Sequence, residues 1–207
     1  MRTVVTNLER EELFHHYNEK ANPFSFVTTK IDITNAYNYS RKHKNLYAVL
    51  CYTFTKAMNQ VDNFKYAYEN GEIVKYDMLN PVYTEMLDTK DVSFISCKLG
   101  SSLEEFIELN KIAKEKFKKT QAVVGFDEEG LGEVWYSCLP WFKFTGVVPP
   151  YDPSITIPQI IWDKYEIVDD HVYINAMIIS HHGFVDGYHI GQLIENINKE
   201  LSELNED

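Results

Sequence analysis

Several features that define common protein classes are missing from this chain of 207 residues. No stretch approaches the roughly 20 continuous apolar residues of a membrane-spanning helix, so we expect no membrane association. No apolar run follows the N-terminal residues, and we therefore expect no secretory signal and a cytoplasmic protein. No linker rich in proline, glycine or serine divides the chain, which predicts one domain over residues 1–207.

Cysteine and positive charge are also scarce. Cys51, Cys97 and Cys138 are far apart and form no C-x-x-C pair, so neither a zinc ribbon nor a thioredoxin-like site is indicated. We expect all three thiols to be reduced. The chain has 20 Lys and Arg against 31 Asp and Glu, a formal net charge of -11. An acidic surface repels phosphate backbones, so nucleic-acid binding is not expected.

Apolar residues are plentiful, at 44% of the chain, and this content excludes intrinsic disorder. Alternation and β-branched residues predict strands, and apolar residues at helical period predict helices, with an acidic loop at 121–132. Because the two types are interspersed, we predict an α/β (α+β) two-layer sandwich in which helices pack on a large mixed β-sheet. The expected strands are 26–33, 71–76, 81–87, 92–97, 134–139 and a hairpin of 160–168 with 172–180. The expected helices are a short one after residue 33, one over 46–61, one that begins at Ser101 or Ser102, and one over 187–204.

One segment, 180–189, carries most of the functional information. A buried apolar strand ends in His181 and His182, a glycine-bounded turn follows, and an amphipathic helix begins near Gly187. Such junctions direct side chains into clefts. Successive strand residues face opposite sides, so only one of the two histidines can belong to a given site.

The residues alone leave three interpretations of this segment open. A zinc site is one, because His181, His182, Asp186 and His189 are of ligand types, although H-E-x-x-H is absent. A structural histidine pair in the core or on the surface is the second. The third is a general base, since imidazole titrates near neutral pH and suits proton abstraction from a hydroxyl.

A family resemblance favours the third interpretation. The run His181-His182-Gly183-Phe184-Val185-Asp186-Gly187 resembles the H-H-x-x-x-D-G signature of chloramphenicol acetyltransferases. The shorter H-x-x-x-D-G also occurs in the acyltransferase domains of pyruvate dehydrogenase-type complexes and in peptide-synthetase condensation domains. Further similar pieces follow in the family's order along nearly the whole chain: 30–34, 59–62, 93–97, Ser137-Cys138-Leu139-Pro140-Trp141 (S-x-x-P-W) and 188–191.

The resemblance implies the chloramphenicol acetyltransferase fold and an acetyl-CoA-dependent O-acetylation of chloramphenicol, which confers antibiotic resistance. It implies no metal, and it implies a homotrimer with active sites at the subunit interfaces. His182 would be the general base, and Ser137 would donate a hydrogen bond to the oxyanion. Asp186 would be held by Arg10 in a bidentate pair that orders the turn.

The resemblance also assigns an apolar substrate pocket. Tyr17 matches a tyrosine that contacts the substrate, and Phe24 and Phe26 are candidates for the same pocket. Two positions depart from the family pattern: Ile161 stands where a threonine often holds a water, and Val92 where a phenylalanine is frequent. The same chemistry on another small alcohol, or a non-catalytic trimeric ligand-binding protein, is therefore the alternative function.

Overall fold

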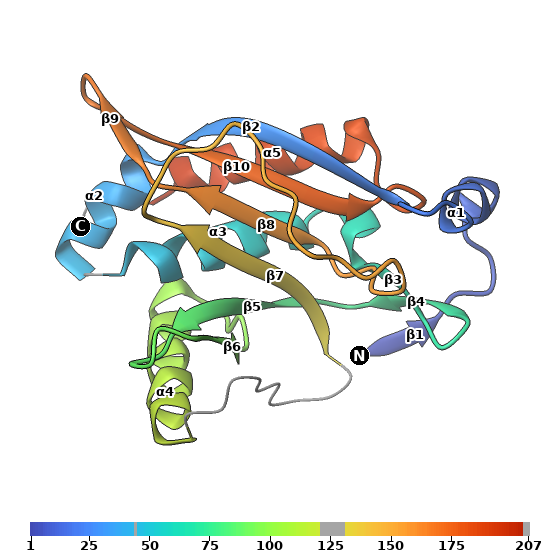
Figure 1. Ribbon diagram of the computed structural model, residues 1–207, viewed down its shortest axis with the longest axis horizontal. Helices are drawn as coiled ribbons and strands as arrows, with labels where there is room; N and C mark the ends of the chain where they lie inside the picture. The colour runs from blue at the N-terminus through green and yellow to red at the C-terminus, as the bar shows by residue number, and fades with distance from the viewer. Residues whose placement is uncertain (44, 121–130, 205–207) are drawn as a thin grey trace.

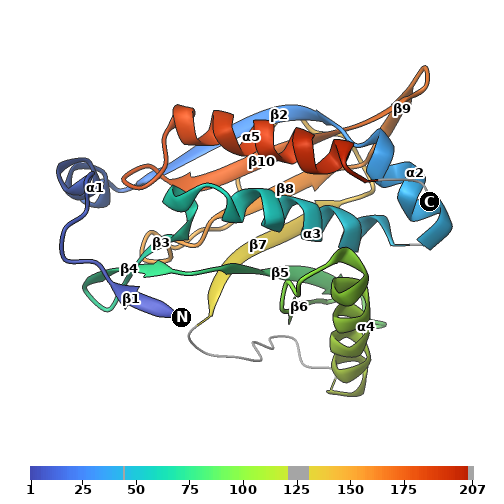
Figure 2. The same cartoon turned by 180° about the vertical axis from the view of Figure 1, so that it is seen from behind.

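The computed structural model describes residues 1–43, 45–120 and 131–204. A large mixed β-sheet forms one layer, and helices cover one of its faces, as Figures 1 and 2 show from opposite sides. The predicted two-layer arrangement is confirmed.

Among the described residues the large sheet has seven strands. Six follow the order β2-β10-β8-β7-β5-β6, and β9 pairs with β10. The β5–β7 and β7–β8 pairs are parallel, and the others are antiparallel. The strands are β2 (Phe24–Asp32), β5 (Leu79–Met86), β6 (Val92–Ser96), β7 (Gly132–Leu139), β8 (Gln159–Asp163), β9 (Glu166–Val168) and β10 (His171–His181).

The helical layer consists of α2 (Thr34–His43), α3 (Leu46–Asn59) and α5 (Gly187–Ser202). Helix α3 is apolar on almost every side and is buried from Ala48 to Thr55, because it lies between the sheet and its neighbouring helices. Helix α5 turns its apolar stripe of Ile190, Leu193, Ile197 and Leu201 inward. Helix α4 (Leu103–Thr120) lies beside β5 and β6.

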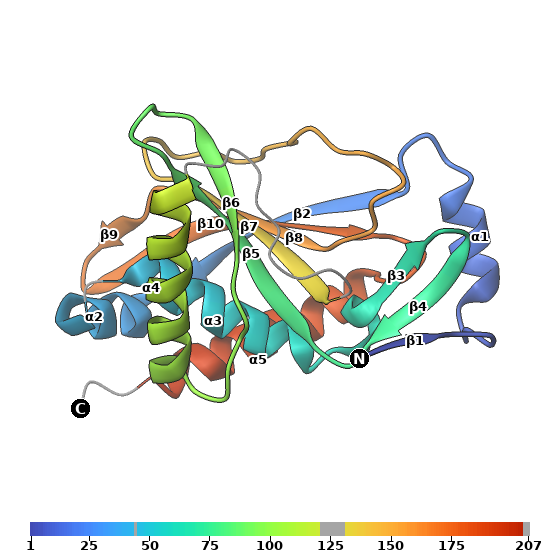
Figure 3. The same cartoon turned by 90° about the horizontal axis from the view of Figure 1, so that it is seen from below.

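A smaller sheet in the order β1-β4-β3 lies at the other end of the molecule from α4 (Figure 3). It contains β1 (Arg2–Val4), β3 (Tyr66–Glu69) and β4 (Glu72–Tyr76), and a 3-10 turn, η1 (Asp62–Lys65), precedes β3. Asn70 and Gly71 join β3 to β4 with φ angles of 53° and 86°, as an Asn-Gly hairpin turn requires. The short helix α1 (Glu11–Asn18) lies at the same end. The sequence patterns did not predict β1, α1, η1 or β3.

The face of the sheet opposite the helices is crossed by the connection 140–158 (Figure 1). An apolar cluster of Phe24, Ile161, Met177 and Ile179 lies on this face, and Phe144 and Val147 of the connection pack against it. The central strands are therefore buried on both sides, as their continuous apolar sequences predicted.

The structure changes one expected strand, and one expected loop lies mostly outside the described residues. The strand expected over 160–168 is divided into β8 and β9, because the Lys164 N–H donates to the Phe142 carbonyl of the connection (3.1 Å) rather than to a neighbouring strand. The loop expected at 121–132 lies outside the described residues up to 130, and Gly132 already belongs to β7.

Candidate active site

The two adjacent histidines occupy different environments at the end of β10. His181 is only 1% exposed and packs among the rings of Phe14, Phe24 and Phe184. Its Nδ1 accepts the Gly183 N–H at 3.2 Å. Burial, with a smaller effect from the charge of His182, lowers the pKa of His181 to about 4. His181 is therefore neutral at pH 7 and part of the core.

His182 faces the other way, as the alternation of strand side chains predicts. Its backbone N–H donates to the Pro23 carbonyl (2.8 Å), and its half-buried ring stacks on Tyr17 with centroids 4.2 Å apart and 12° between the planes. Among the described residues, its Nδ1 has no hydrogen-bond partner. Stacking on Tyr17 thus holds the imidazole, and no side chain in the described part of the protein bonds its Nδ1.

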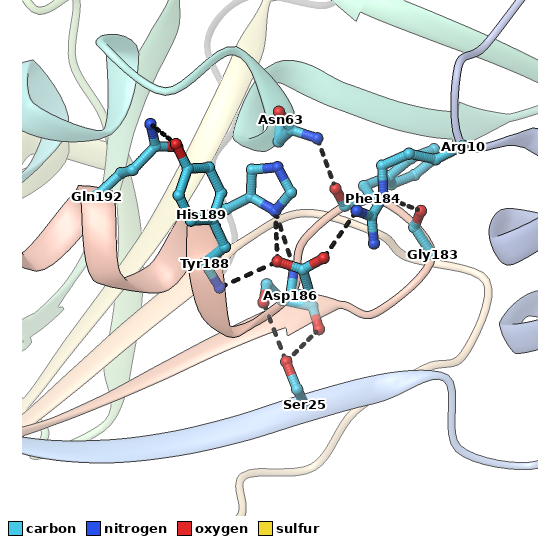
Figure 4. Close-up of polar contacts among 10 residues, drawn as sticks. Arg10, Ser25, Asn63, Gly183, Phe184, Asp186, Tyr188, His189 and Gln192 are labelled. Atoms are coloured by element: carbon cyan, nitrogen blue, oxygen red, sulfur yellow. Dashed lines mark hydrogen bonds and ion pairs between the residues drawn. The ribbon is translucent and has the colours of Figure 1, made fainter.

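Asp186 and Arg10 fasten the turn that follows His182 (Figure 4). The Arg10 Nη1 lies 2.7 Å from Asp186 Oδ2, although the two residues are 176 positions apart in the sequence. The expected bidentate pair is not what forms, because the Arg10 Nε points instead to the Gly183 carbonyl at 3.4 Å. One guanidinium therefore holds both the backbone and the carboxylate of the turn.

Asp186 also begins helix α5. Its Oδ1 accepts the Tyr188 N–H (3.0 Å) and lies 2.9 Å from His189 Nδ1, which makes Asp186 the N-cap. Partial burial acts to raise the pKa of Asp186, but the hydrogen bond from Arg10 and the charges of His189 and Arg10 outweigh it and lower that pKa. The carboxylate stays ionised and serves as a brace for the turn.

Close packing leaves the turn little freedom. A Cβ at Gly183 would lie 2.7 Å from the Phe14 Cα, so only glycine allows helix α1 to approach this closely. The Asn63 side chain donates to the Phe184 carbonyl (2.9 Å) from the opposite side. Helix α1, η1 and the turn are thereby joined around His182.

Ser137 lies on β7, on the sheet face crossed by the connection 140–158. It lines a cavity of about 280 Å³ with Ile161 of β8, which lies directly opposite Ser137 in the register. The Thr84 Oγ1 of β5 donates to Ser137 Oγ at 3.4 Å. The remaining lining residues are Phe94, Trp135, Tyr136, Pro149, Pro150 and Gln159.

The candidate pocket residues are not all in one place. Ile161 lines the cavity beside Ser137, whereas Phe24 belongs to the apolar cluster, and Phe26 packs against that cluster and Tyr151. Val92 is 45% exposed at the start of β6 and does not line this cavity. Phe94, two residues further on the same side of β6, lines it instead. The expected place of Val92 in a substrate pocket stays a prediction.

His182 and Ser137 are far apart within a single chain. Ser137 pairs with Ile161, and Ile161 pairs with Met177, so the three residues lie side by side across the sheet. His182 is five residues beyond Met177. At about 3.3 Å per residue and about 4.8 Å between strands, the two residues are about 19 Å apart. One chain therefore cannot bring both side chains to the same reacting atom.

The zinc interpretation receives no geometric support. His181 faces the aromatic core while His182 faces Tyr17, so the adjacent histidines diverge. Within the described part of the chain, no three His, Cys, Asp or Glu side chains are grouped as metal ligands would be.

No described helix combines the length and apolar character needed to cross a bilayer.

Thr84 and the aromatic residues of the cavity were not predicted as site residues. Their only signal in the sequence is that Phe94 and Trp135 are large side chains at alternate strand positions, which core packing explains equally well. Helix α1 carries Tyr17 but has only eight residues, among them two histidines and two glutamates, so its periodicity is weak.

The chain resembles known proteins along almost its full length. The sequence model described as chloramphenicol acetyltransferase matches residues 2–198. The chloramphenicol acetyltransferase of Staphylococcus aureus is 29% identical over 207 residues, covering 96% of this chain and 94% of its own.

Solved structures show the same fold. A chloramphenicol acetyltransferase structure superposes with a TM-score of 0.84 at 17% identity, covering 97% of this chain and all of its own. The dihydrolipoamide acetyltransferase of Azotobacter vinelandii gives a TM-score of 0.66 at 12% identity, with 94% and 87% coverage. The match of the family over nearly all residues, together with the braced H-H-x-x-x-D-G turn, shows that this chain belongs to the chloramphenicol acetyltransferase family.

Proposed function

We propose that this protein transfers the acetyl group of acetyl-CoA to a hydroxyl of chloramphenicol and thereby inactivates the antibiotic. The observation that carries the proposal is the placement of His182, an imidazole stacked on Tyr17 at the start of a turn that Arg10 and Asp186 brace. An alcohol is a weak nucleophile at neutral pH, so a positioned base is the main requirement of this reaction.

His182 acts as that base. It accepts the proton of the substrate hydroxyl while the oxygen attacks the thioester carbonyl. When the tetrahedral intermediate collapses, the carbon–sulfur bond breaks and the proton passes from the imidazolium to the CoA sulfur. General-base catalysis of this kind contributes typically about 10²–10⁴-fold.

Ser137 stabilises the oxyanion of the tetrahedral intermediate through its hydroxyl. Its position in a small, mostly apolar cavity suits this role, because a hydrogen bond is stronger where water is excluded. Tyr17 fixes the plane of the His182 ring. Phe24, Phe26 and Ile161 supply apolar surface on the same face of the sheet for the aromatic part of the drug.

The active protein is a homotrimer, and each active site lies between two subunits. The separation of about 19 Å between His182 and Ser137 supports this, since His182 of one subunit must meet Ser137 of another. Exposed Trp141 and Phe142, which follow Ser137 on the connection, give apolar surface for such an interface. We place the enzyme in the cytoplasm, where its three unpaired thiols stay reduced.

Thiol release tests the proposal directly. The purified protein is incubated with acetyl-CoA and chloramphenicol, and free CoA is followed with a chromogenic thiol reagent. We expect release that depends on both substrates and falls at least about 10³-fold in His182→Ala. His15→Ala is the matched control, because His15 is an exposed histidine of helix α1. Absence of drug-dependent release in the wild type would refute the assignment, and a panel of small alcohols would then identify another acceptor.

A further inference from the structure

Two hydroxyl groups meet on neighbouring strands beside the cavity of Ser137. Strands β5 and β7 are parallel with Tyr83 opposite Tyr136, so the next residues along, Thr84 and Ser137, are neighbours on the same side of the sheet. The Thr84 Oγ1 donates to the Ser137 Oγ at 3.4 Å, and both residues line the cavity.

We propose that Thr84 is a positioning residue, which orients the Ser137 hydroxyl so that its hydrogen points at the oxyanion of the reaction. The inference rests on the acetyl transfer proposed above. A hydroxyl has one hydrogen and two lone pairs. When Ser137 accepts the Thr84 hydrogen, its own hydrogen is left for another acceptor.

The surroundings of Ser137 decide where that hydrogen goes. Ile161, directly opposite on β8, has an apolar side chain and offers no acceptor. Among the described residues, Ser137 has no side-chain hydrogen bond other than the one with Thr84. The Ser137 hydrogen is therefore available on the cavity side, where negative charge develops on the thioester oxygen. A hydroxyl that already accepts a hydrogen bond is also a stronger donor, by roughly 10–30% for each bond in such a chain.

A buried tyrosine, Tyr47, lies on the other side of Thr84 from Ser137 along the network of hydroxyl groups. The Tyr47 phenol lies near the Thr84 hydroxyl and donates its own hydrogen to the Tyr136 carbonyl at 3.4 Å, so the Thr84 hydrogen stays directed to Ser137. Its ring packs against Tyr83 and Trp162 at 5.5 and 5.1 Å. Burial raises the pKa of Tyr47 well above its ordinary value, so the phenol stays protonated and uncharged.

A double-mutant cycle tests the role of Thr84. The enzymes compared are the wild type, Thr84→Val, Thr84→Ser, Ser137→Ala and Thr84→Val combined with Ser137→Ala, assayed by thiol release from acetyl-CoA with chloramphenicol. We expect Thr84→Val to lower kcat about tenfold and to leave both KM values within about twofold, because the bond acts on the oxyanion donor and not on bound substrate. Thr84→Ser should restore most of kcat. In the Ser137→Ala background, Thr84→Val should have no further effect.

A matched variant separates this role from general packing. The Thr55 hydroxyl bonds the Tyr136 hydroxyl (2.8 Å) and does not reach Ser137, so Thr55→Val removes a comparable bond to a neighbouring residue of β7. We expect Thr55→Val to lower the melting temperature and to keep kcat within about twofold. Wild-type kcat in Thr84→Val, or the same loss with and without Ser137, would overturn the proposal alone. A wild type that releases no thiol would overturn it together with the proposed function.

Discussion

Acidification should destabilise this protein through one identified side chain, His181. The ring is buried among Phe14, Phe24 and Phe184, and its pKa is about 4, against an ordinary value of 6.5. The unfolded chain therefore takes up a proton at this residue at a higher pH than the folded chain does. The contribution of the neutral His181 ring to the free energy of unfolding is complete above about pH 6.5 and is lost as the pH falls from there to about 4.

The size of the loss follows from the shift. A difference of about 2.5 pKa units corresponds to about 3 kcal/mol when both states are protonated. Between about pH 7 and pH 5, His181 becomes mostly protonated in the unfolded chain and stays mostly neutral in the folded chain. Over this range the free energy of unfolding falls by about 2 kcal/mol. This is a large share of the 5–15 kcal/mol that is typical of folded domains.

Urea unfolding followed by tryptophan fluorescence measures this loss. The wild type is compared with His181→Asn at one fixed protein concentration, at about pH 7 and pH 5. An asparagine oxygen can still accept the Gly183 N–H but does not titrate. Every other ionisable group is common to both proteins, so its contribution cancels in the difference. We expect the wild type to lose about 2 kcal/mol more than His181→Asn. Equal losses in the two proteins would refute the link between burial of His181 and acid lability.

Two further predictions concern the groups around His182. Arg10→Gln should reduce kcat/KM about tenfold or more, since it removes the guanidinium that holds Asp186 and the Gly183 carbonyl and so frees the turn. Arg10→Lys should recover only part of this loss, because a lysine cannot hold the carboxylate and the carbonyl together. Wild-type kcat/KM in Arg10→Gln would contradict this. Tyr17→Phe keeps the ring stacked on His182 and should behave as the wild type. Tyr17→Ala should lose about five- to tenfold in kcat/KM, because the stack stabilises the orientation of the His182 ring by about 1 kcal/mol. Thiol-release kinetics check both series, and equal activities of Tyr17→Phe and Tyr17→Ala would show that the stack does not orient the base.

Local patterns in the sequence predicted most of the secondary structure. Helix α5 and the core strands were identifiable because the side-chain periods of 3.6 and 2 are properties of the backbone and need no knowledge of the fold. The short elements β1, α1 and β3 were not predicted, because their stability comes from tertiary contacts. Phe14 shows this for α1: it is 1% exposed and stacks on Phe184 at 4.9 Å.

The sequence by itself determined the family, the location of the histidine turn and the alternation that separates His181 from His182. Only the tertiary structure decided that Arg10 reaches Asp186 with a single nitrogen, that Thr84 lies against Ser137, and that Phe94 and Ile161 line one cavity with Ser137. The physical reason is the distance along the sequence over which each kind of interaction acts. Periodicity and capping act over a few residues, whereas these contacts depend on strand register and chain packing between segments up to 176 positions apart.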